Sequence, residues 1–511
     1  MPWDKIQHLH IPEVTDIVMS FDSVAVHFQP TDAERVSAWL AGFSPTTATT
    51  TSDLAQIHQV PVVYQGKDLA SVADQTGLEV DEVIHLHSTA TYTVAAVGFS
   101  PGFPYLMGLP ERLHLPRIPT PESVAEGSVA IAGSQAGIYP NPSLGGWHVL
   151  GTTNIPLFDP EATPPSLLQP GDTVRFIPTG NVPTGKSSAR GSSPPAPPPV
   201  PPSGPVEIIA PGPATTVQDL GRPGFQTSGV TPGGAADPLT ARVANLLVGN
   251  PESAALLECP IQGPVLRFHQ PATVAFIGWL HPNAGKPVRL NPGDTLDLRV
   301  RMTQPVGYLA IAGGIDLPPA LGSRATDLRA GFGGHLGNPL QPADQLPIGS
   351  PGPTPRPGHW HVAWPHPHPR SGTLEIRYIP GAQTTWFRPR SIAAFQHSTY
   401  RISNHSNRMG LRLDGIAPER ADSREMLSQP VVAGSIQVPP DGRPTVLLAE
   451  RQTIGGYPQI GHVISADIRK LVQAWPGTPV RFRMTTLDEA RAAWKQQAIE
   501  LARLKSRLKL L

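Results

Sequence analysis

The segment that decides the fold is GGWHVLG at residues 145–151, because it recurs as GGYPQIG at residues 455–461. Two further segments recur in the same order: GSV at 127–129 with GSI at 434–436, and PGDTVRF at 170–176 with PGTPVRF at 476–482. Short runs containing β-branched residues, separated by Gly and Pro, are typical of strands joined by tight turns. Three blocks in one order favour duplication of a supersecondary unit over chance similarity between turns. The sequence therefore predicts related β structure in both halves of the chain.

Between the two copies, residues 184–204 read TGKSSARGSSPPAPPPVPPSG. This segment has almost nothing apolar to bury, and its prolines favour an extended polyproline II conformation. We therefore expect a linker that joins two independently folded halves. A chain of 511 residues also exceeds what one hydrophobic core usually serves.

The remaining domain boundaries follow from where strand-like and helical stretches of sequence occur. Residues 1–88 mix strand-like and helical stretches, which predicts a small α/β subdomain. Residues 89–183 and 205–485 are rich in short strand-like runs and turns, which indicates a mainly β protein with barrels. Residues 486–511 open with a capping-box pattern and predict an amphipathic C-terminal helix, with these side chains on related faces: Leu487, Trp494, Leu501, Leu504 and Leu508.

The composition argues against several classes of protein, namely those that bind nucleic acid, span a membrane or are secreted. Basic and acidic residues balance at 39 each, without a basic stripe, which argues against nucleic acid as a partner. No apolar run approaches the roughly 20 residues that span a bilayer, and the N-terminus does not resemble a secretory signal. The single cysteine, Cys259, follows an apolar run, which favours a small buried hydrophobe over a nucleophile. We expect a cytoplasmic protein without a membrane partner.

Two glycine-rich motifs in the first half predict a binding cleft. VGFSPGFPYL at 97–106 and GSVAIAGSQAGIYP at 127–140 place glycines among aromatic residues. Such glycines let backbone N–H groups approach a ligand while the rings form apolar walls. Tight barrel corners explain any single glycine equally well. The candidate substrate-binding residues here are Tyr105, Arg117, Gln135, Tyr139 and His148.

The second half carries charged residues beside glycines. The motifs are VQDLGRPG at 217–224, SNRMGLRLDG at 406–415 and ERQTIGGYP at 450–458. The candidate catalytic residues are Asp219, Arg222, Asp237, Arg408 and Glu450, and the candidate substrate-binding residues are Arg451, Gln452 and Tyr457. The alternative for each charged residue is a salt bridge that braces a turn.

These motifs resemble two related families. Those of the first half are similar to the B subunit of 5-oxoprolinase, also called allophanate hydrolase subunit 1 or the KipI family. Those of the second half are similar to the C subunit of the same enzyme, also called allophanate hydrolase subunit 2, KipA or biotin-dependent carboxyltransferase. The whole chain thus resembles a natural fusion of the two subunits. The resemblance implies a cyclophilin-like β-barrel after the α/β subdomain and two related barrel units in the second half.

The resemblance also implies an activity. It indicates the B and C components of an ATP-dependent 5-oxoprolinase, a cyclic amide hydrolase that converts the lactam 5-oxoproline to L-glutamate together with a separate, LamB/YcsF-like A subunit. Phosphorylation of the lactam carbonyl by ATP needs cations, an acid/base carboxylate and Mg²⁺. We expect ATP with Mg²⁺ as cofactors and no metal site built by the protein itself, and we leave homo-oligomerisation open.

Two other functions remain open. One is a carboxyltransferase that moves CO₂ from carboxybiotin to urea or another amide; this chain has no lysine flanked by methionines, so we expect no covalently bound biotin. The other is a Kip-type regulator that binds a histidine kinase. The sequence departs from the usual pattern of the B subunit family at Glu122 and Thr152, where arginines are common, which favours the second half as the seat of the chemistry.

Two motifs match known functional patterns, but we do not expect either to form a binding site. GNVPTGKS at 180–187 fits the phosphate-loop pattern, but it leads into polyproline and not into a helix. Four histidines between residues 359 and 368 suggest a metal site, but their Pro-rich surroundings favour a surface loop.

Overall fold

The computed structural model describes residues 13–42, 55–180, 202–355, 360–364, 372–422, 424 and 426–510. Most of the expected linker, residues 184–204, lies outside this part of the chain. The phosphate-loop-like motif is described only at Gly180, and His361 is the one described member of the His-rich stretch.

The first barrel is a seven-stranded sheet in the order β10-β7-β8-β5-β4-β11-β3. Its strands are β3 (Ile57–Val62), β4 (Tyr92–Val97), β5 (Pro104–Met107), β7 (Ser128–Ala132), β8 (Gln135–Ile138), β10 (His148–Thr152) and β11 (Thr173–Pro178). A bridge between Val63 and Thr152 brings the two edges of the sheet together, so the barrel is nearly closed. Helices α3 (Leu69–Thr76) and α4 (Val80–Thr89) bury their apolar faces in the core of this sheet.

The C-terminal barrel is closed and has the strand order β21-β28-β25-β26-β23-β22-β29. Its strands are β21 (Leu374–Pro380), β22 (Tyr400–Ile402), β23 (Gly410–Asp414), β25 (Ser435–Gln437), β26 (Thr445–Leu447), β28 (Gln459–Val463) and β29 (Pro479–Met484), with helices α6 (Pro389–His397) and α7 (Ser465–Val472). Both barrels pair their first and last strands in parallel, β3 with β11 and β21 with β29. Strand order and direction therefore match throughout, which confirms the duplication predicted from the recurring segments.

The recurring glycines show why the motif is repeated. Gly127 and Gly434 have φ values of +78° and +93°, in the left-handed region that favours glycine. Their N–H groups donate to Tyr139 O at 2.8 Å and to Leu447 O at 2.7 Å. An added Cβ would lie 2.1 Å from Thr153 O in one barrel and 2.6 Å from Val463 O in the other. The same turn is thus required twice.

Between the barrels, residues 206–348 form a middle unit of two sheets around one core. The sheets have the orders β18-β15-β12-β20 and β13-β14-β19-β16-β17. The elements are β12 (Val206–Ala210), β13 (Thr216–Gln218), α5 (Pro238–Leu247), β14 (Leu256–Pro260), β15 (Val265–Phe268), β16 (Ala272–Ile277), β17 (Val288–Leu290), β18 (Thr295–Asp297), β19 (Val306–Ile311) and β20 (Gln345–Leu346). Helix α5 packs on the second sheet against β16 and β19.

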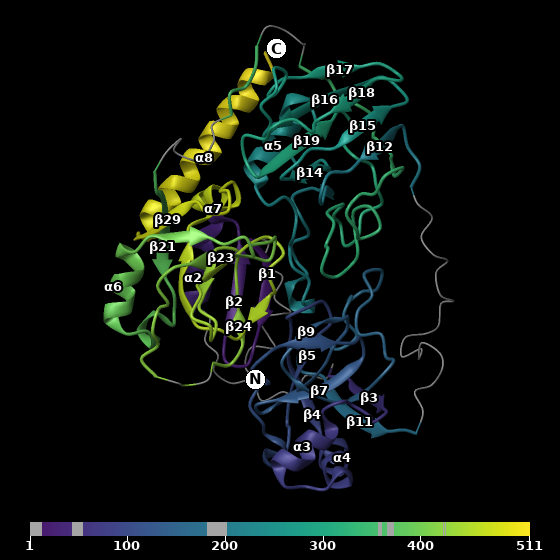
Figure 1. Ribbon diagram of the computed structural model, residues 1–511, viewed down its shortest axis with the longest axis vertical. Coiled ribbons are helices and arrows are strands. Elements are labelled where there is room, and N and C mark those ends of the chain that lie inside the picture. The colour runs from purple at the N-terminus through teal and green to yellow at the C-terminus, as the bar shows by residue number, and fades with distance from the viewer. Residues whose placement is uncertain are drawn as a thin grey trace.

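The first hairpin of the chain packs on the second half as well as on the first barrel. Strands β1 (Val14–Met19) and β2 (Val24–Phe28) pair antiparallel and precede α2 (Ala33–Gly42). They contact β24 (Gln429–Pro430), which pairs with β27 (Ile454–Gly455). In Figure 1 the hairpin and α2 lie beside the C-terminal barrel, whereas α3 and α4 lie at the far end of the first barrel. Residues 1–88, expected as one subdomain, are thus divided between two places, because strand pattern does not specify which sheet a strand joins.

The C-terminal helix, α8 (Leu487–Leu508), begins where its capping pattern predicts. Thr486 accepts a hydrogen bond from Glu489 N at 3.2 Å. The helix packs on α5 and α7, with Leu501 and Leu508 buried, and so connects the C-terminal barrel with the middle unit (Figure 1). Leu487, placed on the same apolar face by its spacing, is 53% exposed.

The remaining elements are short. Strands β6 (Glu122–Val124) and β9 (Ser143–Gly145) pair with each other, and 3₁₀ helices lie at Pro30–Asp32, Glu111–Leu113, Gln226–Ser228 and Thr384–Trp386. Among the described residues, no helix is both long enough and apolar enough to cross a membrane.

Candidate functional site

The aromatic face of the first barrel is covered by other parts of the same chain. Phe103, Tyr105 and Tyr139 form one buried cluster with residues of the β1–β2 hairpin and with Ile454 of β27. A Cβ added at Gly98 would lie 2.7 Å from the Ile454 side chain, so a glycine there lets the two halves approach. The cleft predicted from the first-half motifs is therefore part of a junction between the halves.

Tyr105 lies at the centre of this junction. Burial raises the pKa of its hydroxyl, whereas Arg117, the Ser428 hydroxyl and Arg329 act in the opposite direction, and Tyr457 adds to the rise. The hydroxyl is consequently protonated at neutral pH and can donate a hydrogen bond. We call these five residues, Tyr105, Arg117, Arg329, Ser428 and Tyr457, the junction site.

Arg329 was not predicted from the sequence. Its guanidinium lies 4.5 Å from the centre of the Phe99 ring, which belongs to the first half. Burial lowers its pKa, with Asp327, Tyr105 and Glu450 opposing that shift. Within the described residues it forms no ion pair. The signal that could have found it is the glycine-rich run that follows, GFGG at 331–334, which resembles the glycine-rich settings of the predicted residues.

A buried charge network lies behind the junction site. Arg408 forms ion pairs with Glu258 and with Glu450, the latter at 2.7 Å, and donates to Gly234 O at 2.7 Å. Burial alone would lower the pKa of Arg408, but the two carboxylates outweigh it and raise the pKa. Burial raises the pKa of Glu450, with Arg408 opposing. The structure thus brings the predicted Arg408 and Glu450 together and adds Glu258, which the sequence presents only as part of the apolar run LLECP.

The network continues to Asp237. The Tyr308 hydroxyl donates to Glu258 Oε2 at 2.8 Å and accepts from Asp237 N at 2.7 Å. The Asp237 carboxylate caps α5, accepting from Thr240 N at 3.1 Å and Thr240 Oγ at 2.6 Å, and it also accepts from Gln473 Nε2 at 3.1 Å. Its side chain is fully buried. This geometry gives Asp237 a positioning role at the start of α5.

Asp219 and Arg222 brace loops of the second half. Asp219 accepts from Gly221 N at 2.7 Å, Ser323 Oγ at 2.6 Å and Arg324 N at 2.7 Å. Arg222 is 1% exposed and donates to the carbonyls of Ala320 and Ala325. Among the described residues these contacts are hydrogen bonds and not the salt bridges that the alternative named.

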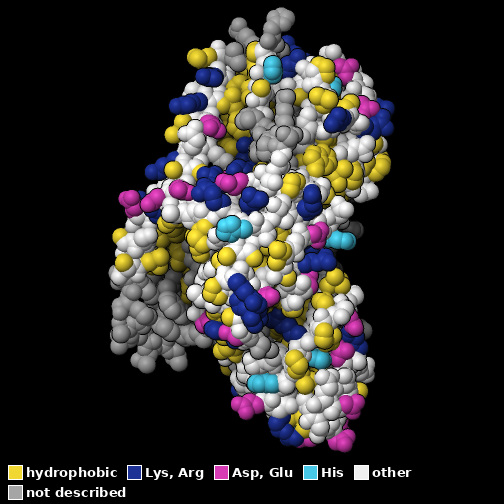
Figure 2. All heavy atoms as spheres, turned by 60° about the vertical axis from the view of Figure 1, so that its left-hand side comes forward, with side chains coloured by type: hydrophobic (Ala, Val, Ile, Leu, Met, Phe, Trp, Pro, Cys, Tyr) yellow, Lys and Arg dark blue, Asp and Glu magenta, His cyan; other side chains and the backbone are white. Residues whose placement is uncertain are grey.

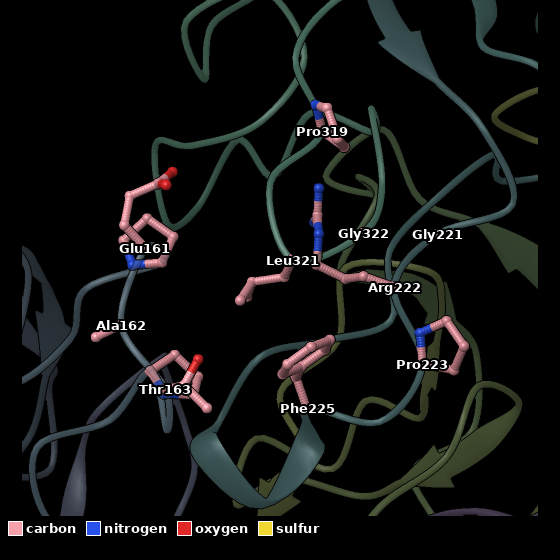
Figure 3. A pocket seen from close by; sticks show the side chains of 12 residues that line it. Glu161, Ala162, Thr163, Gly221, Arg222, Pro223, Phe225, Pro319, Leu321 and Gly322 are labelled. Carbon is pink, nitrogen blue, oxygen red and sulfur yellow. The ribbon is translucent and has the colours of Figure 1, made fainter.

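Arg222 also lines a cavity of about 510 Å³ between residues 160–165 of the first half and residues 221–225 and 319–322 of the second. Figure 3 shows Arg222 and Leu321 on one side of this cavity and Glu161 and Thr163 on the other. The Arg222 guanidinium runs along the wall toward Pro319 and does not cross the cavity (Figure 3).

The other first-half candidates lie around the junction. His148 Nε2 is 2.9 Å from Pro116 O, which fixes the segment that carries the exposed Arg117. Gln135 is buried, and its Oε1 has no hydrogen-bond partner among the described residues. Burial raises the pKa of Tyr139.

The other second-half candidates point away from Glu450. Gln452 Nε2 donates to Gln437 Oε1 at 3.3 Å. Arg451 donates to Gln226 Oε1 at 2.8 Å and to Val431 O at 3.3 Å. Arg451 is therefore not part of the junction site, although it follows Glu450 directly.

Comparison with known proteins gives the family. The model of the carboxyltransferase domain, subdomain A and B, matches residues 228–484, and that of subdomain C and D matches residues 3–168. The chain is 38% identical to the C subunit of 5-oxoprolinase from Escherichia coli K12 over 302 residues, which are 57% of this chain and 95% of that protein. It is 51% identical to the B subunit of 5-oxoprolinase from Escherichia coli O157:H7 over 124 residues, or 24% of this chain and 57% of that protein.

Other relatives include urea amidolyase of Lachancea kluyveri, 30% identical over 319 residues, which are 57% of this chain and 17% of that protein. The crystal structure of TTHA0988 superposes with a TM-score of 0.79 at 34% identity, covering 94% of this chain and 95% of that one. The urea carboxylase of Kluyveromyces lactis gives a TM-score of 0.53 at 27% identity, over 58% of this chain and 29% of that one. The chain therefore belongs to the carboxyltransferase-domain family, and it joins in one polypeptide the regions similar to the B and C subunits of 5-oxoprolinase.

Proposed function

We propose that the chain is the combined B and C component of an ATP-dependent 5-oxoprolinase, which works with a separate A subunit. The observation that carries this proposal is the junction site. Each half is similar to a different subunit of one named enzyme, and Arg117 of the first half and Arg329, Ser428 and Tyr457 of the second all lie near enough to Tyr105 to act on its pKa. A fusion keeps the two parts of such a site at high effective concentration.

The chemistry requires activation of a stable lactam. In the proposed reaction the γ-phosphoryl group of ATP passes to the lactam oxygen and ADP leaves. One water then adds to the carbon that bears the phosphorylated oxygen. The C–N bond of the ring breaks, which frees the amine and leaves an acyl phosphate. A second water releases phosphate and glutamate. Charge develops on oxygen at each step, so hydrogen-bond donors and cations in a buried site lower the barriers.

The junction site offers such groups. In the proposal the protonated Tyr105 hydroxyl donates to the developing oxyanion, while Arg329 and Arg117 balance carboxylate or phosphate charge. Arg408, which is itself paired with Glu258, holds Glu450 in place behind them. Asp219, Arg222 and Asp237 act as positioning residues, through the loop and helix contacts described above.

Mg²⁺ fits this proposal as a companion of ATP. Among the described residues no group of three or more His, Cys, Asp or Glu side chains is arranged to hold a metal ion. Mg²⁺ in phosphoryl-transfer enzymes takes most of its ligands from phosphates and waters, with one or two carboxylates, so a protein cage is not needed. The ion would neutralise phosphate charge.

The test is glutamate release from 5-oxoproline and ATP, measured with the chain and its cognate A subunit. We expect turnover that needs both proteins and that falls in Tyr105→Phe. No turnover with a folded chain and an A subunit that is active with separate B and C subunits would contradict the proposal.

The second candidate is a carboxyltransferase component that accepts CO₂ from a biotin carried on another protein. It is favoured by the match to the carboxyltransferase domain and by 30% identity to a urea amidolyase. Transfer of a labelled carboxyl group from the carboxybiotin of a partner protein to urea, in the absence of glutamate release, would favour this candidate.

A further inference from the structure

A groove of about 1030 Å³ lies between the middle unit and the C-terminal barrel. Its apolar lining residues are Ile261, Leu280, Val300 and Met302 of the middle unit and Trp475, which follows α7. Ile261 and Leu280 are each 63% exposed, and Val300 and Trp475 are exposed as well. In Figure 2 hydrophobic side chains gather on the upper right of the molecule, over the middle unit, with Lys and Arg side chains near them. Exposed apolar side chains that line one groove indicate a contact surface for another protein.

Ile261 has an unfavourable backbone conformation in the wall of this groove. Its φ of +68° lies in the left-handed region, where a β-branched side chain is an outlier. Gln262 N donates to Pro260 O at 2.7 Å across Ile261, so the residue is the centre of a γ-turn of the rare, strained kind. Glycine would adopt the same turn without a steric cost. The exposed isoleucine therefore strains the turn and covers little of the chain itself, which indicates that its side chain serves a contact with another molecule.

The charged residues of the groove are basic. Arg299 and Arg301 line it and are both exposed, and no acidic residue lines it within the described part of the chain. Arg299 is paired with Asp297 at 2.6 Å, whereas Arg301 forms no ion pair with any described residue. Arg301 is thus available to a carboxylate. A partner that places an apolar side chain on Ile261 and a carboxylate at Arg301 would complement the groove in both polarity and charge.

Both sides of the groove are close in sequence to the buried charge network. Ile261 directly follows β14, the strand that carries Glu258. Trp475 lies shortly after Gln473, whose side chain donates to Asp237 Oδ2 at 3.1 Å. A protein bound in the groove would therefore hold the strand and the loop that position this network.

We infer that the groove is the docking surface for the A subunit, which occupies it with an apolar side chain beside a carboxylate. The identity of the partner rests on the proposed function, in which the A subunit is the separate protein that the chain needs; the strained Ile261 and the unpaired Arg301 do not depend on it. A second copy of this chain fits less well. A twofold contact would bring Arg299 and Arg301 of both copies together, with no acidic residue among those that line the groove in the described part of the chain.

The test is calorimetric titration of the full chain with the cognate A subunit. Ile261→Gly should weaken binding about tenfold to a hundredfold, as loss of an anchoring side chain predicts. The Tm of the isolated variant should equal or exceed that of the wild type, because glycine relieves the strain of the turn. Leu336→Gly is the matched control, because Leu336 also has a positive φ, of +55°, is 37% exposed and does not line the groove. It should leave binding unchanged.

A second variant tests the charge of the groove. Arg301→Glu should weaken A-subunit binding about tenfold or more, because it places a carboxylate against a carboxylate. Arg289→Glu is its control, since Arg289 is exposed on β17 and does not line the groove. Equal affinity of the A subunit for the wild type, Ile261→Gly and Arg301→Glu would overturn the inference, and so would an A subunit that does not bind the wild type. Self-association of the wild type that Ile261→Gly abolishes would assign the groove to a second copy instead.

The two proposals fail separately. Glutamate release that reaches half its maximum at the same A-subunit concentration in the wild type and in Ile261→Gly would overturn the docking surface and leave the proposed function standing. A-subunit binding that Ile261→Gly weakens, in a chain that never releases glutamate, would keep the docking surface and overturn the function.

Discussion

Arg408, in the turn before β23, forms an ion pair with Glu258 of β14, a residue 150 positions earlier in the chain. The pair ties the C-terminal barrel to the middle unit. Glu258 is also held by the Tyr308 hydroxyl and by Ala236 N. Its position is therefore fixed from both units.

Arg408→Met should destabilise the protein by about 3 to 5 kcal/mol, because Glu258 and Glu450 are left buried without their cation. The loss should be smaller at pH 5 than at pH 8, since burial raises the pKa of Glu450, which can then take up a proton more easily. Urea unfolding at both pH values measures it. Arg412→Met, at an exposed position of β23, serves as the control, and a loss below about 1 kcal/mol for Arg408→Met would contradict the network.

Asp467 should make stability depend on acid pH. Burial alone would raise its pKa, but hydrogen bonds from Arg377 and Lys470 outweigh this and hold the pKa below its ordinary value. A depressed folded-state pKa contributes stability above the unfolded value of about 3.9, and that contribution is lost as the pH falls through the folded pKa. Asp467→Asn should therefore lower the Tm at pH 7 and have little effect near pH 2.

The control for Asp467 is Asp488→Asn, because the Asp488 side chain is 95% exposed. Its Tm should follow the wild type across the whole range. An Asp467→Asn deficit that is as large at pH 2 as at pH 7 would mean that packing, and not charge, explains the loss.

Ile454 should hold the two halves together without a covalent connection. Fragments 1–190 and 191–511, expressed together, should co-purify, because Ile454 is buried in the first-barrel cluster and Asp16 accepts from Gln226 N at 2.9 Å. Ile454→Asp should abolish co-purification by placing a charge in that cluster. Size-exclusion chromatography decides, with Ile499→Asp at an exposed site of α8 as control.

Tyr105→Phe should reduce glutamate release about tenfold or more while leaving the Tm within a few degrees, because only a hydroxyl is removed. Since burial raises the pKa of Tyr105, the wild-type activity should show no loss from its ionisation below pH 10. A Tyr105→Phe variant with wild-type kcat/KM would remove Tyr105 from the proposed site.

Cys259 should not react with a thiol reagent in the native protein. It is fully buried, and burial raises the pKa of its thiol to about 12. Reaction with a chromogenic disulfide at pH 8 should require denaturant. Rapid labelling of the native chain would contradict its place in the core of the middle unit.

The recurring segments allowed the related barrels to be predicted, because the same tight turns occur in both barrels and require glycine at the same positions. Gly127 and Gly434 occupy the same left-handed position in both barrels, so the sequence records the duplication directly. The division of residues 1–88 could not be predicted in this way. The β1–β2 hairpin has an ordinary strand pattern, which does not show which part of the protein it packs on.

Prediction of the site was partial for a similar reason. Arg408 and Glu450 stand in motifs with glycines and do meet, but Asp237 has the same appearance and caps a helix. Glu258 became visible only through long-range packing, whereas Arg329 had one sequence signal, the glycine-rich run at 331–334. Periodicity identifies residues that face a core, but not charged residues that meet across two units.

The β1–β2 hairpin also determines when the chain can finish folding. It is made before the first barrel, yet the surface that it packs on includes Ile454 and β24, which are made much later. At about 5 to 20 residues per second, the hairpin waits roughly 20 to 90 s for them. Until then the side of the hairpin that faces Ile454 and β24 is uncovered, although Phe21 can already pack on Tyr105, so we expect slow translation and C-terminal truncation to promote aggregation through this surface.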